Sequence, residues 1–236
     1  MKKGFTLAEV LITLAIIGVV AALTIPTVIA NYQKKQFYTG FMKAYNVLQT
    51  AFNLSSVENG SPSAWVWENN QASFMKYIGN FLKVQAICKD DADKCGVSEG
   101  AIDTKYLNKT PGLGDYHTVL EALPFSLSLQ DGSIIFGTYL EIDGVHVTHI
   151  AYDVNGAKGP NIGGRDVFTF WISKQGDDIK LYPLGVYDIN YPFAGKTNTL
   201  SGITDSTESS FNCSTTITSE GAACGARLLL EGKMDY

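Results

Sequence analysis

The first thirty residues, MKKGFTLAEVLITLAIIGVVAALTIPTVIA (residues 1–30), set the architecture of the chain. No charged residue occurs from Val10 to Ile25, and Glu9 is the one carboxylate in this segment. As a helix, residues 5–30 would be about 39 Å long at 1.5 Å per residue, which is enough to cross a bilayer core. A charge in such a segment costs about 2.5–3.5 kcal/mol at the helix centre and less near an edge. We therefore expect Glu9 to have a functional role.

Two ordinary kinds of apolar amino terminus compete to explain this segment. A signal peptide would use Lys2 and Lys3 as its positively charged n-region and would be cut after Ala21 or Ala30. A charged residue such as Glu9 is unfavourable in the apolar h-region of a signal peptide. A plain membrane anchor explains the length and not the carboxylate. In either case the positive-inside rule keeps Lys2 and Lys3 in the cytoplasm and predicts that the chain beyond the apolar run is exported.

A third interpretation explains both the length and the charge. The run KKGFTLAE (residues 2–9), followed by an apolar segment with Gly18 and Pro26, resembles the amino terminus of type IV prepilins and type II secretion pseudopilins. In that family, prepilin peptidase cuts after the glycine on the cytoplasmic side and methylates the new terminal amine. The resemblance therefore implies cleavage between Gly4 and Phe5, and N-methylphenylalanine at position 5. The sequence resemblance covers the leader and the apolar run. Beyond them, the chain resembles the family only in its expected architecture.

The resemblance also gives roles to three residues of the apolar segment. In the family, the glutamate that corresponds to Glu9 pairs with the terminal amine of a neighbouring subunit, which would fix the axial register as a buried polar residue does in a coiled coil. Opposite charges attract strongly in such a low-dielectric setting, but pairing of Glu9 with the amine of its own Phe5 remains the alternative. Gly18 weakens helix propensity and Pro26 removes a backbone hydrogen bond. Both match positions where family members bend during assembly, and Pro26 could also mark the membrane exit.

Composition predicts one globular domain after the anchor. The chain has 236 residues, 17% of them charged and 11% aromatic, as in globular proteins. The net charge is −5, and loss of Lys2 and Lys3 on cleavage would make it −7. No basic patch with interleaved aromatic residues occurs, so we expect no nucleic-acid partner for this domain.

Four cysteines can pair in three ways. Pairing in sequence order closes the shortest loops, so we favour Cys88–Cys95 and Cys213–Cys224, and an oxidising compartment outside the cytoplasm would permit both. A zinc site is the alternative, although neither pair has the usual zinc-ligand spacing and no histidine is near. Many type IV pilins have a disulfide-closed loop near the carboxy terminus, and Cys213–Cys224 resembles it.

Periodicity predicts two helices outside the membrane segment. Residues 31–56 continue the first helix with one apolar stripe at three- and four-residue steps: Phe37, Phe41, Ala44, Tyr45, Leu48, Ala51 and Phe52. A second helix is predicted over residues 71–87, with Phe74, Ile78, Phe81 and Leu82 inward. Residues 96–116 contain helix and strand breakers and are expected to be irregular.

The pattern then changes to alternating strands with Asp-Gly hairpin signals at Asp131 and Asp143. The predicted strands cover residues 125–130, 133–142, 145–154, 167–173 and 179–184. The fold class is therefore α+β and pilin-like: a long amino-terminal helix, membrane-spanning in its first half, packed on an antiparallel meander of four or five strands. The expected division is a leader (1–4), an assembly helix (5–30), its amphipathic continuation (31–56) and an exported domain (57–236), with a loop-like tail at 198–218.

One internal stretch could bind a metal ion. Between residues 153 and 166 the chain places oxygen-bearing side chains among glycines, as calcium sites do: Asp153, Asn155, Asn161 and Asp166. The later acidic positions of an EF-hand are missing. The competing interpretation is a long turn held by side-chain to backbone hydrogen bonds.

No catalytic or nucleotide-binding fingerprint is present, so we expect a structural protein and not an enzyme. The resemblance implies a minor pilin or pseudopilin of a type IV pilus or type II secretion pseudopilus. It would be a single-pass protein of the bacterial inner membrane and later part of the filament. Its partners would be prepilin peptidase, other pilin subunits, an inner-membrane assembly platform and membrane lipid. A membrane-tethered exported binding domain or enzyme that never assembles is the alternative.

Overall fold

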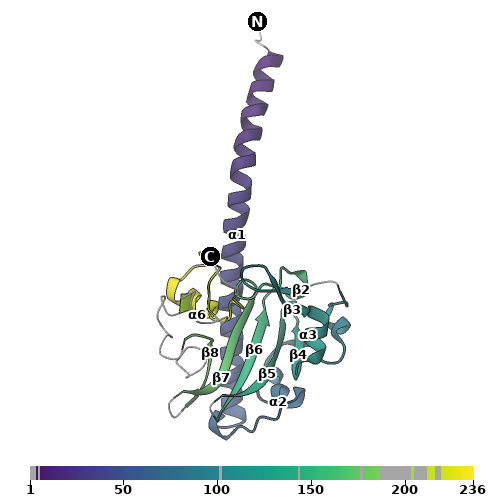
Figure 1. The fold of residues 1–236 in the computed structure, drawn as a ribbon, viewed down its shortest axis with the longest axis vertical. Helices are drawn as coiled ribbons and strands as arrows, with labels where there is room; N and C mark the ends of the chain where they lie inside the picture. Colours follow the sequence, from purple (N-terminus) through teal and green to yellow (C-terminus); the bar gives the residue numbers. More distant parts are fainter. Residues whose placement is uncertain are drawn as a thin grey trace.

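One helix, α1 (Leu7–Glu58), runs the full height of the molecule, and the other described elements are gathered around its second half (Figure 1). At 1.5 Å per residue its 52 residues extend for about 78 Å. The structure is a computed structural model, and it describes residues 4, 6–100, 103–142, 144–175, 178–186, 203–204, 212–215 and 219–236. Most of the tail at 198–218 and position 143 of the second Asp-Gly signal lie outside these residues.

The second half of α1 packs on a six-stranded antiparallel sheet with strand order β1-β4-β5-β6-β7-β8. Its strands are β1 (Val84–Ile87), β4 (Phe125–Leu129), β5 (Ile134–Ile142), β6 (Val145–Asp153), β7 (Val167–Gln175) and β8 (Asp178–Pro183). The predicted α+β class and the antiparallel meander are confirmed. The turn at Asp131 is tied to α1 by an ion pair, in which Nζ of Lys43 lies 2.6 Å from Oδ2 of Asp131.

The sheet has one strand more than predicted, because the predicted helix over residues 71–87 is wrong in its second half. Helix α2 (Gln71–Tyr77) gives way to a 3-10 turn, η2 (Gly79–Phe81), and the chain then becomes β1. Apolar residues at helical spacing continue past Tyr77, and this spacing suggested a longer helix. The four residues of β1 instead alternate between partly buried and exposed, and β1 pairs with β4, more than thirty residues along the chain.

Residues 96–116 are also more regular than predicted. A small two-stranded sheet forms from β2 (Asp103–Lys105) and β3 (Pro111–Asp115), and α3 (Tyr116–Ala122) follows at once. Asp115 starts α3 by accepting a hydrogen bond from the backbone N–H of Thr118 at 3.2 Å, which is the usual role of an N-cap aspartate.

The main core lies between α1 and one face of the sheet. The predicted stripe is confirmed, with Phe41, Ala44 and Leu48 fully buried and Phe37 and Tyr45 partly buried. The ring of Phe41 lies 5.0 Å from that of Phe168 and 5.9 Å from that of Phe170, both on β7. Burial of large aromatic side chains is the main favourable contribution to stability in such a layer.

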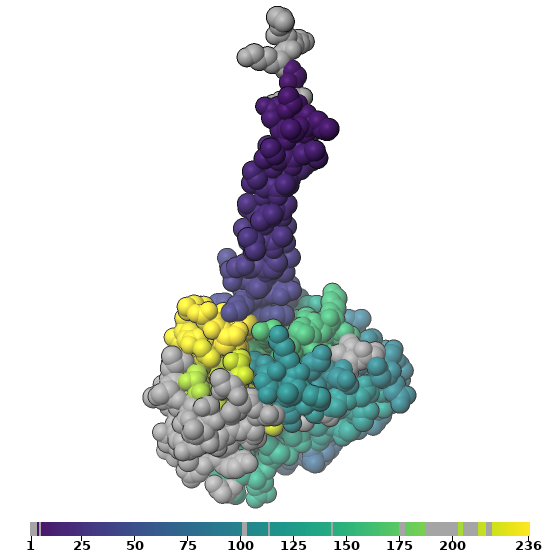
Figure 2. Space-filling view, turned by 45° about the horizontal axis from the view of Figure 1, so that its top comes forward, coloured from purple at the N-terminus to yellow at the C-terminus, as the bar shows by residue number. Residues whose placement is uncertain are grey.

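The opposite face of the sheet is covered by the shorter elements. Trp171 of β7 packs with the segment that precedes α6 (Cys224–Glu231), while Phe136 of β5 packs beneath α3. Helix α6 also reaches the α1 side, where Gly225 lies so close to Phe41 that a Cβ there would be 3.0 Å from the ring. The globular part is thus layered on both sides of one sheet, and the first half of α1 projects from it (Figure 2).

Candidate functional site

The amino-terminal end of α1 is built around Thr6 and Glu9. The Glu9 carboxylate accepts hydrogen bonds from the backbone N–H and the hydroxyl of Thr6, both at 2.8 Å, and the Thr6 hydroxyl oxygen accepts one from the Glu9 N–H at 3.3 Å. This reciprocal pair is a capping box, which satisfies helix N–H groups that have no partner within the helix. The negative charge of Glu9 also lies at the positive end of the helix dipole. Glu9 therefore has local partners within its own chain.

The predicted cleavage point lies immediately before this cap. Gly4 is exposed, and no atom lies within 4 Å of the position that a Cβ would occupy there. Phe5 lies outside the described residues. Cleavage after Gly4 would replace a neutral amide with an ammonium group one residue before Thr6, whose own N–H already contacts Glu9. The new positive charge would therefore form close to this carboxylate. Glu9 could then form an ion pair either with the terminal amine of its own chain or with that of a neighbouring chain.

The apolar half of α1 projects from the globular part (Figure 1). From Leu7 to Ala30 every residue is exposed except Ala21, which is partly buried. α1 is the one helix in the described part of the chain that is long and apolar enough to cross a membrane. Gly18 has open space around it, and α1 continues unbroken through Pro26. An uncovered apolar surface of this size needs lipid or other subunits to cover it.

Comparison with known families decides what this segment is. The family of the prokaryotic N-terminal methylation motif matches residues 1–25. Residues 1–25 are a prepilin-type cleavage and methylation segment. This prepilin segment is the one found in type IV pilins and pseudopilins, and it supports a pilin-like exported protein that prepilin peptidase processes. Comparison of the chain with curated proteins and with solved structures gives no match.

Away from the prepilin segment, the structure places the cysteines in two pairs at disulfide distance. The Cα atoms of Cys88 and Cys95 are 5.6 Å apart, and those of Cys213 and Cys224 are 4.7 Å apart. These are the pairs that sequence order favours. The first closes a short loop around the 3-10 turn η3 (Ala92–Cys95), and the second attaches the preceding segment to the start of α6.

The end of β6 and the chain that follows it bring together the four residues proposed as calcium ligands. Asp153 and Asp166 are fully buried, and Asn161 is 1% exposed. Oδ1 of Asp153 accepts from the backbone N–H of Asn155 and Gly156 at 3.1 and 2.8 Å. The Asp166 carboxylate accepts from the N–H groups of Asn161 and the next residue at 2.8 and 2.7 Å. Backbone donors thus hold both carboxylates in place, as the turn interpretation requires.

Within the described ranges, no cationic side chain balances the charge of this cluster. No lysine, arginine or histidine in the described part of the chain forms an ion pair with Asp153 or Asp166. Burial, together with the charge of Asp166, raises the pKa of Asp153, and burial raises the pKa of Asp166. The Tyr116 hydroxyl donates to Asp153 at 2.9 Å. Two buried carboxyl groups this close either share protons or need a positive charge.

The side-chain amides of the cluster lie beside the two carboxylates. The side-chain amide of Asn161 faces two acceptors, so its NH₂ group is the end that points to them and donates at 3.2 Å to Oδ2 of Asp153 and to the carbonyl of Gly156. Oδ1 of Asn155 is buried and has no hydrogen-bond partner among the described residues. The described part of the chain holds no group of three or more His, Cys, Asp or Glu side chains suited to a metal ion. A cation here would need amide and carbonyl oxygens beside the two carboxylates.

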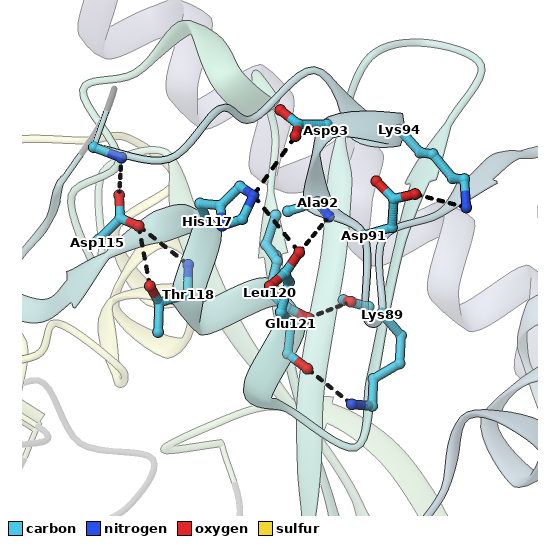
Figure 3. Close-up of polar contacts among 12 residues, drawn as sticks. Lys89, Asp91, Ala92, Asp93, Lys94, Asp115, His117, Thr118, Leu120 and Glu121 are labelled. Atoms are coloured by element: carbon cyan, nitrogen blue, oxygen red, sulfur yellow. Dashed lines mark hydrogen bonds and ion pairs between the residues drawn. The ribbon is translucent and has the colours of Figure 1, made fainter.

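A second polar cluster, missed by the sequence analysis, joins the Cys88–Cys95 loop to α3 (Figure 3). Oε1 of Glu121 accepts from the backbone N–H of Ala92 at 3.1 Å, and Nζ of Lys89 donates to the Glu121 carbonyl at 2.8 Å. Nε2 of His117 lies 3.6 Å from the Glu121 carboxylate and 4.0 Å from that of Asp93. These contacts attach the disulfide loop to α3, which is a structural role. Only the tertiary fold brings these distant positions together.

Proposed function

We propose that the chain is a structural subunit, a minor pilin or pseudopilin, of a type IV pilus or a type II secretion pseudopilus. Prepilin peptidase cuts it between Gly4 and Phe5 and methylates the amine of Phe5, and it then assembles through α1. The observation that carries this proposal is the prepilin segment on a helix whose whole apolar half is uncovered. A lone tether would also be apolar, but it would not need a glycine, a phenylalanine and a glutamate at these offsets.

In this proposal the monomer is a single-pass protein of the bacterial inner membrane with its domain on the outer side. The apolar half of α1 lies first in lipid and then in the filament core, against other subunits supplied by an inner-membrane assembly platform. The role is structural and not enzymatic, and the globular domain gives the filament its surface. The competing function is a tethered exported domain that stays in the membrane.

Fractionation of the native host distinguishes the two. We expect the processed chain to be recovered with sheared surface filaments, or with pseudopili when the secretion system is overproduced, and to form crosslinks to other subunits through residues of α1. A Gly4→Leu variant, blocked at the cleavage point, should remain in the membrane fraction. Recovery of the wild-type chain in the membrane fraction alone, with no crosslink through α1, would favour the tethered domain.

A second candidate function is calcium binding after β6. The two buried carboxylates of Asp153 and Asp166, which form no ion pair with a cation among the described residues, support it. The side-chain amide of Asn161 lies beside the carbonyl of Gly156 and Oδ2 of Asp153. With calcium bound, this amide would rotate to present its oxygen, and oxygens of these three kinds are typical calcium ligands. Asp166 and Asn155 would complete the set. The ion would supply the positive charge that no described side chain gives to the two buried carboxylates.

Calcium titration of the full chain in neutral detergent tests this second function. Extracellular calcium modules bind with dissociation constants of about 0.1–1 mM, so about 10 mM calcium should raise the melting temperature by about 3–10 °C. Magnesium at the same concentration should have a smaller effect, because it demands a tighter geometry. An unchanged melting temperature in calcium would leave the metal-free turn as the explanation.

An Asn161→Asp variant separates the two accounts of the cluster. The left-handed backbone of Asn161, with φ of 53°, is also accessible to aspartate. If an oxygen of residue 161 binds calcium, the variant should be less stable than wild type without calcium and should regain its melting temperature when calcium is added. If the amide of Asn161 instead donates hydrogen bonds, the variant should lose stability that calcium does not restore.

A further inference from the structure

The face of the globular domain from which α1 emerges has two hollows beside the helix. One lies between α1 and the carboxy-terminal segment, and it is lined by Asn31, Lys34, Lys35, Tyr38 and residues 232–235. The other lies between α1 and the chain around β2, and it is lined by Gln33, Phe37, Lys105, Lys109, Pro160, Ile162 and Arg165. Figure 2 looks towards this face, where α1 leaves the domain beside the yellow carboxy-terminal segment.

These hollows collect positive charge on a chain that is acidic as a whole. Their linings hold six cationic side chains and one carboxylate, that of Asp235, although the net charge of the chain is −5. Asp235 lies 2.8 Å from Nζ of Lys233 and 3.9 Å from Nζ of Lys34. In the described part of the chain, four of the cations form no ion pair with a carboxylate: Lys35, Lys105, Lys109 and Arg165. We call the six cations, Lys34, Lys35, Lys105, Lys109, Arg165 and Lys233, the basic collar.

The height of the collar on α1 matches the surface of a membrane. The apolar run ends at Ala30, and Lys34 lies four residues later, about 6 Å further along the helix. The headgroup layer of a bilayer is about 5–8 Å thick on each side of its hydrocarbon core. When the apolar half of α1 spans a bilayer, the collar therefore lies at the level of the lipid headgroups, within a Debye length of their charges.

We propose that the basic collar binds the phosphate groups of anionic phospholipids in the leaflet from which the domain emerges. The inference rests on the membrane insertion of α1 in the proposed function. Each lysine or arginine near an anionic bilayer surface raises affinity by about fivefold, and the arginine fork can contact a phosphate through two parallel hydrogen bonds. Such binding would keep the domain in contact with the membrane surface until the subunit leaves the bilayer and joins a filament.

Native mass spectrometry of the full-length chain in neutral detergent tests the proposal with two short-chain lipids. We expect the wild-type chain to retain phosphatidylglycerol about tenfold more than phosphatidylcholine. A collar variant, Lys105→Gln/Lys109→Gln/Arg165→Gln, should lose this preference. A matched variant with three lysines changed elsewhere on the surface, Lys76→Gln/Lys94→Gln/Lys174→Gln, should keep it. The changed lysines in both variants are exposed and Arg165 is partly exposed, and equal melting temperatures would verify their folding.

Several results would overturn the proposal. Equal retention of the two lipids by wild type would do so, as would the same loss of preference in both triple variants. Displacement of phosphatidylglycerol by an equal concentration of inorganic phosphate would assign the collar to free phosphate and not to lipid. Loss of self-association in the collar variant, with its lipid preference unchanged, would assign the collar to contacts between copies of the chain. A failure of filament recovery would leave these lipid ratios unaffected, so the two proposals are tested separately.

Discussion

Replacing Phe41 with alanine is expected to lower the free energy of unfolding of the globular domain by about 3–5 kcal/mol, the usual cost of removing a fully buried phenylalanine. Phe41 of α1 is completely buried against β7 and α6, with aromatic rings of β7 at 5.0 and 5.9 Å. Removal of the ring would leave a cavity in the core. This cavity would not close, because the strands of the sheet hold the sheet and α1 in place. Urea unfolding of the full chain in detergent, followed by tryptophan fluorescence, measures the change.

Val57 provides the matched control on the same helix. Its side chain is 87% exposed near the end of α1, so Val57→Ala should change the free energy of unfolding by no more than about 0.5 kcal/mol. A Phe41→Ala loss below about 1 kcal/mol would mean that the second half of α1 is not packed on the sheet as described.

Replacing Glu9 with alanine is expected to lower the amount of chain recovered in filaments by about tenfold or more, while insertion in the membrane is retained. Removing one partner of a poorly solvated ion pair leaves the other charge unpaired, which typically costs 3–5 kcal/mol, and 1.4 kcal/mol is a factor of ten. Here the charge left behind would be the terminal ammonium of Phe5. Quantitative immunoblots of sheared filament and membrane fractions measure the ratio.

A Thr6→Ala variant shows whether capping alone explains Glu9. Thr6 is the other half of the capping box, through contacts of 2.8 and 3.3 Å, and its replacement typically costs about 0.5–2 kcal/mol at the helix end. The carboxylate is kept, so filament recovery should stay within about twofold of wild type. Equal losses in the two variants would mean that Glu9 acts only as a helix cap.

The sequence predicted most accurately those elements whose signals are local. The stripe that includes Phe41 and Leu48 follows helical spacing, and the Asp-Gly turn at Asp131 determines the pairing of β4 with β5. The strand β1 was missed because it is only four residues long and gains its stability from pairing with β4, a long-range contact. Periodicity in a short apolar run cannot distinguish a helix from a strand.

The candidate sites also differ in whether local sequence signals or long-range contacts form them. The spacing of oxygen-bearing residues was sufficient to predict that Asp153 and Asp166 would lie close together, because they lie at the two ends of one short segment between β6 and β7. The contribution of Tyr116, whose hydroxyl contacts Asp153 from α3, could not be predicted, since it depends on how α3 packs over the sheet. The basic collar was not predicted either, because the fold brings Lys34, Lys105 and Lys233 to one face from three distant parts of the chain.

Mass spectrometry of the amino-terminal peptide of the chain, purified from its native host, tests most directly whether the prepilin segment functions as proposed. We expect the peptide to begin at Phe5, to carry one methyl group on its terminal nitrogen and to lack residues 1–4. A terminus at Met1 would show that the segment is not processed, and one at Ala22 or Asn31 would identify an ordinary signal peptide. Any of these three termini would contradict the assignment of this chain as a pilin-like subunit.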